Sequence, residues 1–360
     1  MKPPEIHKGR GALSNPEGRF ESIRKKTESD GWDTPAAEEE LPPLKTELRP
    51  DPARSIISRN DSPDIPFSQS INPYKGCEHG CIYCYARPSH AYLNLSPGLD
   101  FETKLFYKAD AAALLDRELR RPGYRVSSMM LGANTDPYQP VEKKLEVTRS
   151  ILEVLRRFHH PVGLITKSTL ITRDLDILVE LARERLVTVM VSITTLDDEL
   201  KRSLEPRAAS PRSRLKTVET LAKAGVPVGV MTAPIIPMVN DAEMEHILEL
   251  AAGAGACGAG YVLLRLPYEL KDLFKEWLTA HYPLKAEHVM SLIRQSRGGQ
   301  EYQSEFGTRM RGTGKYAELI AQRFALACKR HGLGLGRRMG LDLTRFRVPP
   351  EGGQMDLWAE

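Results

Sequence analysis

The stretch Asn72-Pro73-Tyr74-Lys75-Gly76-Cys77-Glu78-His79-Gly80-Cys81-Ile82-Tyr83-Cys84-Tyr85-Ala86-Arg87 carries three of the chain's five cysteines within eight positions. An odd number of cysteines, with three on one glycine-containing loop, favours metal binding or catalysis over disulfide bonds. Thiolates at Cys-x3-Cys-x2-Cys spacing can converge on one cuboidal iron–sulfur cluster and leave one iron without a protein ligand. A structural zinc site would need a fourth ligand, and the candidates are His79, His90, Cys257 and Cys328. The spacing favours the cluster.

Around this loop, short apolar runs alternate with longer amphipathic stretches. The predicted strands are residues 67–71, 126–131, 162–166, 187–193, 226–232 and 261–266. Helices are predicted over 173–184, over 215–222 before a C′ Gly225, and from Asn240, where Glu243 would complete a capping box. Strands separated by crossover helices pair in parallel. Six units are fewer than the eight of a closed barrel, so the sequence predicts an α/β fold with a partial TIM barrel, (β/α)6.

The composition divides the 360 residues into three parts. Residues 1–62 are rich in Pro, Glu, Arg and Lys and lack apolar periodicity, so we expect an extended or disordered tail. Residues 63–284 form the predicted partial barrel. Residues 285–360 form a helical, basic extension, with helices around 285–297 and 315–331 that follow another around 271–281.

The basic charge is concentrated near the end of the chain. Between Arg309 and Arg347, ten basic residues stand against two acidic ones, a net charge of +8, whereas the whole chain carries +4. Such a segment, interspersed with glycines, suits either contact with a nucleic-acid backbone or a solvated helix face. No apolar run approaches the ~18 residues of a membrane span, and an apolar signal segment is absent from the first residues. We therefore expect no membrane contact and a cytoplasmic location.

The cysteine loop resembles the signature of the radical S-adenosylmethionine (SAM) superfamily, Cys-x3-Cys-x-aromatic-Cys, with Tyr83 as the aromatic residue. Residues 132–140 (GANTDPYQP), 166–168 (TKS) and 205–207 (EPR) are similar to the branch that contains spore photoproduct lyase, and this likeness covers about residues 65–270. It implies a partial (β/α)6 barrel that holds a 4Fe-4S cluster on Cys77, Cys81 and Cys84, with SAM chelating the open iron. An external flavodoxin- or ferredoxin-like electron donor would drive cleavage of SAM to a 5′-deoxyadenosyl radical, which abstracts hydrogen from a substrate.

The likeness also suggests roles for residues that follow the predicted strands. By resemblance, Lys167 would neutralise the SAM carboxylate. The other candidates for binding the cofactors are the aromatic residue of the loop, the strand-end hydroxyls and the polar residues of the loops, namely Tyr83, Ser192, Thr194, Asn134, Asp136 and Arg207. Arg207 would face a carboxylate or pair with Glu205. Tyr138 is the candidate catalytic residue, because a phenol at a barrel mouth can stack on a base, donate a hydrogen bond or relay a radical. Each residue also has a structural alternative, as an ordinary strand hydroxyl, turn residue or solvated charge.

One position departs from the branch. In spore photoproduct lyase a cysteine after the second strand returns hydrogen to the product radical, and Ala133 stands at the position that matches. The same repair reaction is therefore not implied, and Cys257 and Cys328 are the remaining candidate donors besides the loop. Two functions follow from the sequence. The first is a radical SAM enzyme whose substrate the sequence does not name, with a nucleic acid or nucleotide as the class weakly favoured; the alternative is a zinc-stabilised nucleic-acid-binding protein without radical chemistry.

Overall fold

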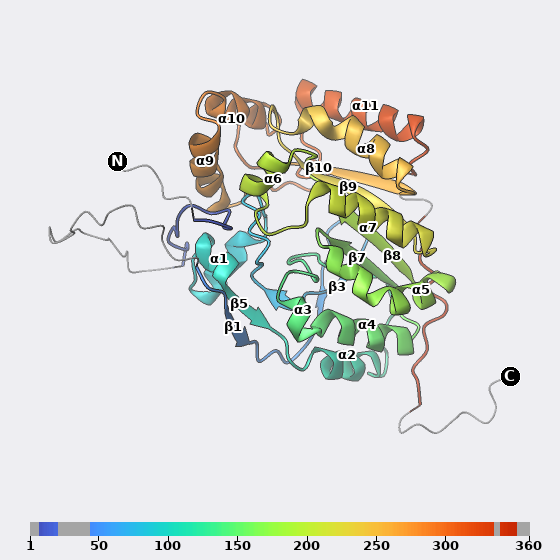
Figure 1. Ribbon diagram of the computed structural model, residues 1–360. Coiled ribbons are helices and arrows are strands. Elements are labelled where there is room, and N and C mark those ends of the chain that lie inside the picture. The colour runs from blue at the N-terminus through green and yellow to red at the C-terminus, as the bar shows by residue number, and fades with distance from the viewer. Residues whose placement is uncertain (1–6, 21–43, 335–338, 351–360) are drawn as a thin grey trace, which may run out of the picture.

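The computed structural model describes residues 7–20, 44–334 and 339–350. Its centre is a sheet with the strand order β10-β9-β8-β7-β6-β3-β2 (Figure 1). The parallel strands are β3 (Gln69–Ile71), β6 (Met129–Leu131), β7 (Val162–Thr166), β8 (Val187–Ser192), β9 (Val228–Ile235) and β10 (Gly258–Leu263). The edge strand β2 (Ile57–Arg59) pairs antiparallel with β3. The six predicted strands and the α/β class are confirmed.

Helices connect successive strands and cover the sheet (Figure 1). They are α3 (Glu142–Leu145) and α4 (Val147–Arg157), η2 (Thr169–Asp174) and α5 (Leu175–Arg183), α6 (Asp198–Leu204) and α7 (Pro211–Lys223), and η3 (Asp241–Glu243) and α8 (Met244–Gly253). Helix α7 shows why they begin and end where they do. The Ser210 hydroxyl accepts the Ser213 N–H at 3.2 Å at its start, and Gly225 adopts a φ of +80° after its end, as predicted.

The predicted capping box before α8 does not form. The Asn240 side chain instead accepts the Ile236 N–H at 2.7 Å and donates to the Thr194 carbonyl at 2.8 Å. The Glu243 carboxylate accepts the Leu196 N–H at 2.5 Å. Both side chains are therefore used to join the loops after β8 and β9, which is a tertiary role that a local pattern does not show.

A second, smaller sheet lies beside the first and was not predicted. It has the order β1-β5-β4, with β1 (Glu47–Pro50) parallel to β5 (Lys104–Tyr107) and β4 (Tyr74–Lys75) antiparallel to β5. The connection from β3 to β6 also contains η1 (Arg87–Leu93), α1 (Leu99–Thr103) and α2 (Ala111–Leu119).

Residues 1–62 were predicted to form an extended or disordered tail, and the disordered alternative is wrong for residues 7–20 and 44–62. Ala12 and Ile56 are buried, and two strands form within 44–62. The physical reason is that these segments pair with side chains far along the chain: the Ala12 N–H donates to Glu102 at 2.8 Å and the Ile56 N–H to Glu118 at 2.6 Å. Residues 1–6 and 21–43 lie outside the described residues.

The chain ends in the three predicted helices, α9 (Leu270–His281), α10 (Ala286–Gln295) and α11 (Gly314–Arg330). Helix α11 packs against α8 and β10. Beyond Arg330, the described residues 331–334 and 339–350 contain no α-helix. Among the described residues, no helix has both the length and the apolar character that a bilayer span requires.

Candidate functional site

The three clustered cysteines lie on the loop that follows β3 and β4, at the carboxyl edge of the parallel sheet, where α/β folds place their chemistry. Gly76 (φ +78°) and Gly80 (φ +67°) supply left-handed backbone conformations within it. The Cys84 N–H donates to the Cys81 carbonyl at 3.2 Å. Cys77 and Cys81 are buried, Cys84 is half-buried, and all three thiols are free. The sequence-predicted ligands are thus together on one glycine-shaped loop.

The candidate fourth zinc ligands lie elsewhere or face other groups. His79 Nδ1 is 3.3 Å from Asp136 Oδ2, and His90 Nε2 is 3.0 Å from a backbone carbonyl oxygen. Cys257 precedes β10 at the opposite, amino edge of the sheet, where its thiol donates to the first residue of β9 at 3.3 Å. Cys328 is buried on α11. Neither of these two thiols is placed to return hydrogen at the carboxyl edge.

The thiols of the loop fit a cluster better than a single ion. A zinc ion holds its ligands within about 2.0–2.3 Å of one centre, whereas each cysteine of an iron–sulfur cube binds a different iron. In the described part of the chain, no three His, Cys, Asp or Glu side chains are arranged around one ion. Three free, neighbouring sulfur donors without a fourth match a cube that keeps one iron open.

A buried ion pair lies against the aromatic residue of the loop. The Tyr83 hydroxyl and the Thr194 hydroxyl both donate to Glu205, the latter at 2.7 Å. Arg214 donates to the other Glu205 oxygen and, at 3.0 Å, to the Ser192 carbonyl. Burial alone would raise the pKa of Glu205, but the nearby Arg214 guanidinium lowers it to about 2. The site therefore contains a buried carboxylate that stays charged. The Thr194 hydroxyl donates its hydrogen bond to this carboxylate.

Lys167 lies directly after β7, beside this pair. Its ammonium nitrogen is 5.7 Å from the centroid of the Tyr83 ring and has no hydrogen bond or ion pair with another described residue. Burial would lower the pKa of Lys167, but the negative charges of Cys81 and Glu205 raise it above its usual value. The structure thus places an unpartnered cation beside the cysteine loop.

Asp136 does not offer its carboxylate to a ligand. One oxygen accepts the Thr166 hydroxyl at 2.7 Å and the Tyr138 N–H at 2.9 Å, and the other accepts the Lys167 N–H at 2.7 Å and lies 3.3 Å from His79. Burial would raise the pKa of Asp136, but His79 and these donors lower it to about 2. Asp136 therefore fixes the loop after β6 to the end of β7, and direct binding of SAM by this carboxylate stays a prediction.

Asn134 and Ser192 keep side chains without a partner among the described residues. The Asn134 backbone N–H donates to Asn72 at 3.0 Å, and the Ser192 carbonyl receives a hydrogen bond, but neither residue's own amide or hydroxyl is engaged there. Both residues lie at the carboxyl edge, after β6 and at the end of β8. They remain available to a ligand.

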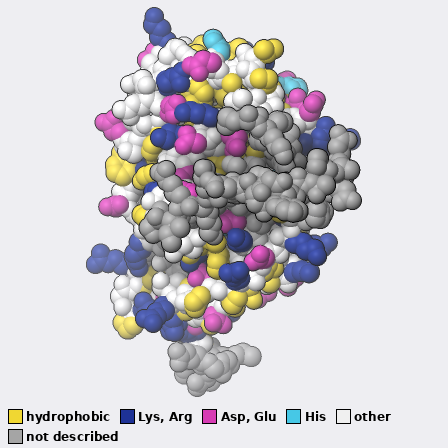
Figure 2. Space-filling model, turned by 90° about the vertical axis from the view of Figure 1, so that its left-hand side faces the viewer, with side chains coloured by type: hydrophobic (Ala, Val, Ile, Leu, Met, Phe, Trp, Pro, Cys, Tyr) yellow, Lys and Arg dark blue, Asp and Glu magenta, His cyan; other side chains and the backbone are white. Residues whose placement is uncertain are grey.

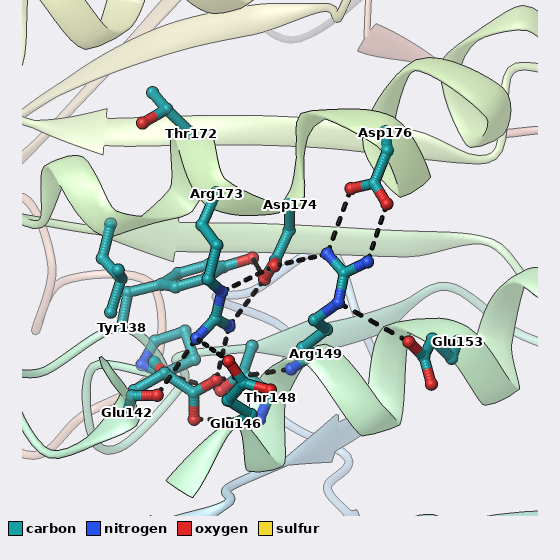
Figure 3. Close-up of polar contacts among 12 residues, drawn as sticks. Tyr138, Glu142, Glu146, Thr148, Arg149, Glu153, Thr172, Arg173, Asp174 and Asp176 are labelled. Carbon is teal, nitrogen blue, oxygen red and sulfur yellow. Dashed lines mark hydrogen bonds and ion pairs between the residues drawn. The ribbon is translucent and has the colours of Figure 1, made fainter. Parts of the chain in front are cut away.

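Tyr138 is not at the mouth of the barrel. Figure 3 shows its phenol directed at Asp174, to which it donates at 3.0 Å. Asp174 is also paired with Arg149 at 3.0 Å and with Arg173 at 2.8 Å, and Arg173 continues to Glu142 at 2.8 Å. The Tyr138 ring is fully buried in the main apolar core. The structure therefore places the Tyr138 phenol between α4 and α5, and a catalytic role for it stays a prediction that this position does not support.

Arg207 was expected either to pair with Glu205 or to face another carboxylate. The structure shows the second arrangement, with Glu78 as the carboxylate. The two side chains approach within 3.1 Å, and Glu78 also accepts the Thr46 hydroxyl at 2.5 Å. Glu205 pairs with Arg214 instead. Arg207 thus holds the segment between the first two cysteines of the loop.

Two further residues at this edge escaped the sequence analysis. Tyr85 follows Cys84, is 48% exposed, and donates its hydroxyl to the carbonyl of Ala133. The Arg265 guanidinium, which comes from the segment after β10, lies 5.6 Å from the Tyr85 ring centroid. Tyr85 could have been recognised as a site residue because it follows Cys84 directly. Arg265 is 180 positions further along the chain, and no local pattern connects it to Tyr85.

The basic segment is partly neutralised. Arg309 pairs with Asp64, Arg323 with Glu245 at 2.7 Å, and Arg345 with Asp342 at 3.3 Å. On α11, exposed cations make no ion pair with a described carboxylate; they are Lys315, Lys329 and Arg330. Arg337 and Arg338 lie outside the described residues. In the described part of the segment, three of the basic side chains are thus neutralised by carboxylates.

Sequence comparison finds similarity to a large family and to individual proteins. The family model of the radical SAM superfamily matches residues 71–251. An uncharacterized protein of Mycobacterium tuberculosis is 37% identical over 232 residues, which are 64% of this chain and 68% of that protein. An uncharacterized protein of Methanocaldococcus jannaschii is 28% identical over 173 residues, 48% of this chain and 62% of that protein.

Structural comparison finds similarity to spore photoproduct lyase. The lyase complexed with dinucleoside spore photoproduct gives a TM-score of 0.58 at 15% identity, over 79% of this chain and 80% of that one. A mutant with bound AdoMet and dinucleoside spore photoproduct gives 0.58 at 14% identity, over 82% of each chain. At this identity the likeness is one of fold.

Proposed function

Because this chain belongs to the radical SAM superfamily and is therefore a radical SAM enzyme, we propose that Cys77, Cys81 and Cys84 each bind one iron of a 4Fe-4S cluster. The observation that supports this most directly is the loop itself, which carries three free thiols at the Cys-x3-Cys-x2-Cys spacing. The zinc-stabilised protein without radical chemistry is at odds with membership of this family.

When bound, the cluster and SAM would supply the chemistry: one electron from an external donor cleaves SAM, and the resulting 5′-deoxyadenosyl radical abstracts hydrogen from the substrate. Radical SAM enzymes generally need such a donor, and we propose a flavodoxin- or ferredoxin-like protein. The chain's own residues would bind the cluster and SAM, orient them and shield them from solvent. Glu205 and Arg214 stay charged and buried behind Tyr83, so that they hold its ring against the loop.

For SAM, we propose that Lys167 binds the carboxylate and that Asn134 and Ser192 donate or accept further hydrogen bonds. The support is that these side chains have no hydrogen-bond partner among the described residues, whereas the oxygens of Asp136 and Thr194 are engaged by the protein. Asp136 and Thr194 therefore position the loops that carry the ligand contacts.

The function is tested by anaerobic reconstitution with iron and sulfide. The expected product is a coloured protein with visible absorption that falls on reduction by dithionite, and that releases 5′-deoxyadenosine from SAM under reducing conditions, as measured by mass spectrometry. Stoichiometric zinc with no visible chromophore would contradict the proposal.

Replacing Lys167 by Ala should weaken SAM binding while the cluster is preserved, because its proposed partner is a carboxylate and not iron. A lost charge-assisted contact of about 1.5–3 kcal/mol corresponds to roughly ten- to a hundredfold in affinity. Equilibrium dialysis of the reconstituted protein measures it. Lys216→Ala, an exposed lysine on α7, is the matched control and should bind like wild type. An unchanged affinity in Lys167→Ala would remove this residue from the site.

For the substrate, we propose a nucleic acid. The supports are the fold shared with a lyase whose solved complex contains dinucleoside spore photoproduct, and the unpaired cations of α11. Ala133 stands where spore photoproduct lyase has its hydrogen-returning cysteine. We therefore propose a reaction that differs from the repair carried out by that lyase. On the face that carries α1 and α9, Figure 2 shows basic and acidic side chains interspersed over the described surface. A nucleic-acid contact is therefore better sought on α11 than on that face.

If α11 contacts phosphates, the logarithm of the affinity for DNA or RNA should fall linearly with the logarithm of the salt concentration. The slope is about −0.9 per phosphate on duplex DNA or −0.7 on single strands. Arg330→Ala should reduce the slope by about one such step, because one contact is lost. Arg323→Ala is the control, since Arg323 is already paired with Glu245. A protein without salt-dependent affinity for any nucleic acid would point to a small molecule or a protein as the substrate.

A further inference from the structure

Residues 10–16, which we name the N-terminal strap, lie against the cysteine loop from outside the barrel. Figure 1 shows this segment in dark blue beside α1 and below α9. Its Ala12 is fully buried in an apolar cluster that also contains Cys81, Leu99 and Trp277. A segment close to the start of the described chain thus shares a core with a candidate cluster ligand.

The closest approach is between two glycines. A Cβ on Gly11 would lie 1.9 Å from the carbonyl oxygen of Gly80, far inside any allowed contact. Gly80 is the residue just before Cys81, and its positive φ makes it one of the turns of the loop. Only glycine at position 11 lets the strap reach this point, so a change there must move either the strap or the loop.

A buried charge pair fixes the contact. The Glu102 carboxylate accepts the Gly11 N–H at 3.0 Å, the Ala12 N–H at 2.8 Å and the Arg87 guanidinium at 2.5 Å. Arg87 in turn donates to the carbonyl oxygens of Gly80 at 3.1 Å and Cys81 at 2.8 Å. Arg87 and Glu102 are both fully buried. Strap, carboxylate, guanidinium and cysteine loop therefore form one continuous hydrogen-bonded unit.

The far end of the strap is attached to two helices. The Ser14 hydroxyl donates to Glu276 of α9 at 2.7 Å. The Asn15 amide donates to Asp100 of α1 at 3.2 Å, and the Asp100 N–H donates back to Asn15 at 2.9 Å. The strap thus bridges α1 and α9, which lie on either side of it.

We propose that the N-terminal strap is a positioning element of the radical SAM site: it holds Gly80 and Cys81 in place and keeps solvent away from this side of the thiols. The role of the strap in a radical SAM site rests on the proposed function, whereas its contacts with the cysteine loop do not. Since the loop has no regular secondary structure at Gly80 and Cys81, its shape there depends on what contacts its carbonyl groups. Arg87 donates hydrogen bonds to both, and Gly11 of the strap packs against the Gly80 carbonyl.

The test is the rate at which iodoacetamide alkylates each cysteine in the metal-free, full-length protein, followed peptide by peptide by mass spectrometry. Gly11→Ala should make Cys77 and Cys81 react several-fold faster than in wild type, whereas Cys328, which is buried on the distant α11, should keep its rate. Gly253→Ala is the matched control, because nothing lies within 4 Å of its added Cβ. Equal rates at the loop in Gly11→Ala and wild type, or an acceleration shared by Cys328, would overturn the proposal.

Asn15→Ala covers the case in which Gly11→Ala does not fold, since it removes only the exposed contacts with Asp100. It should accelerate alkylation of Cys81 by a smaller factor, and a rate equal to wild type overturns the proposal. In reconstituted protein, the same variants should lose the visible absorption of the cluster faster in air. If wild type assembled no cluster, the proposed function would fail, while the alkylation rates would still decide whether the strap positions the loop.

Discussion

Replacing any one of Cys77, Cys81 and Cys84 by alanine should abolish iron–sulfur assembly almost completely. Each thiolate is proposed to hold a separate iron, so the loss of one leaves a second iron without a protein anchor. The change from cysteine to alanine removes a single atom, and the loop backbone is held by its own glycines and by Arg87, so the chain should still fold. Iron and sulfide content after anaerobic reconstitution, together with circular dichroism, measure the two effects.

Cys257→Ala and Cys328→Ala are the matched controls, since they make the same chemical change in thiols away from the carboxyl edge of the sheet. Both should assemble the cluster as wild type does. A full 4Fe-4S spectrum in Cys77→Ala, Cys81→Ala or Cys84→Ala would refute the assignment of ligands. A failure of the two controls to bind iron would show that any cysteine loss disturbs the fold, and the loop would no longer be singled out.

The part of the fold that the sequence predicted well is the part that depends on local pattern. Strand β7 was placed at its observed bounds because a run of β-branched and apolar residues, buried on both faces, is followed at once by Lys167. The six parallel strands follow in chain order, since each crossover helix brings the next strand beside the last. The cysteines, too, lie on one loop, so their spacing alone was enough to group them.

What escaped prediction depends on contacts between distant residues. The strap has few apolar residues and reads as disordered, but Glu102 supplies acceptors for its backbone and thereby makes it part of the core. Likewise β1 has all of its side chains exposed, and its order comes from the ladder with β5. Neither partner can be inferred from the sequence of the segment itself.

The side-chain directions of two candidate site residues could not be predicted, and the two cases share one cause. Position in the loop after β6 was enough to predict that Asp136 and Tyr138 lie near the carboxyl edge, but not which way the side chains turn. The Asp136 carboxylate turns to Thr166 and the backbone of Lys167, and the Tyr138 phenol turns to the buried Asp174 (Figure 3). Burial of a polar group requires a partner, and here the partners come from neighbouring strands and helices rather than from a ligand.

Replacing Arg214 by Met should lower the free energy of unfolding by about 3–5 kcal/mol, because it leaves the fully buried Glu205 carboxylate without its cation. The double variant Arg214→Met with Glu205→Gln should recover part of the loss, since a neutral amide can still accept from Tyr83 and Thr194 without needing a counter-charge. Urea unfolding followed by circular dichroism, at equal iron content, measures each variant. A loss that the second substitution does not relieve would mean that Arg214 acts through packing alone.

Lys223→Met on the same helix is the control, because its pairing with Glu219 is on the exposed surface and should contribute little.

The buried pair of Glu205 and Arg214 also predicts how stability depends on pH. Since the pKa of Glu205 falls from its usual 4.5 to about 2 on folding, its contribution is fully present above pH 4.5 and is lost as the pH falls toward 2. Glu205→Gln should therefore show a shallower loss of stability than wild type over this interval. An equal slope in both would mean that folding does not lower the pKa of Glu205, and that Arg214 does not stabilise its charged form.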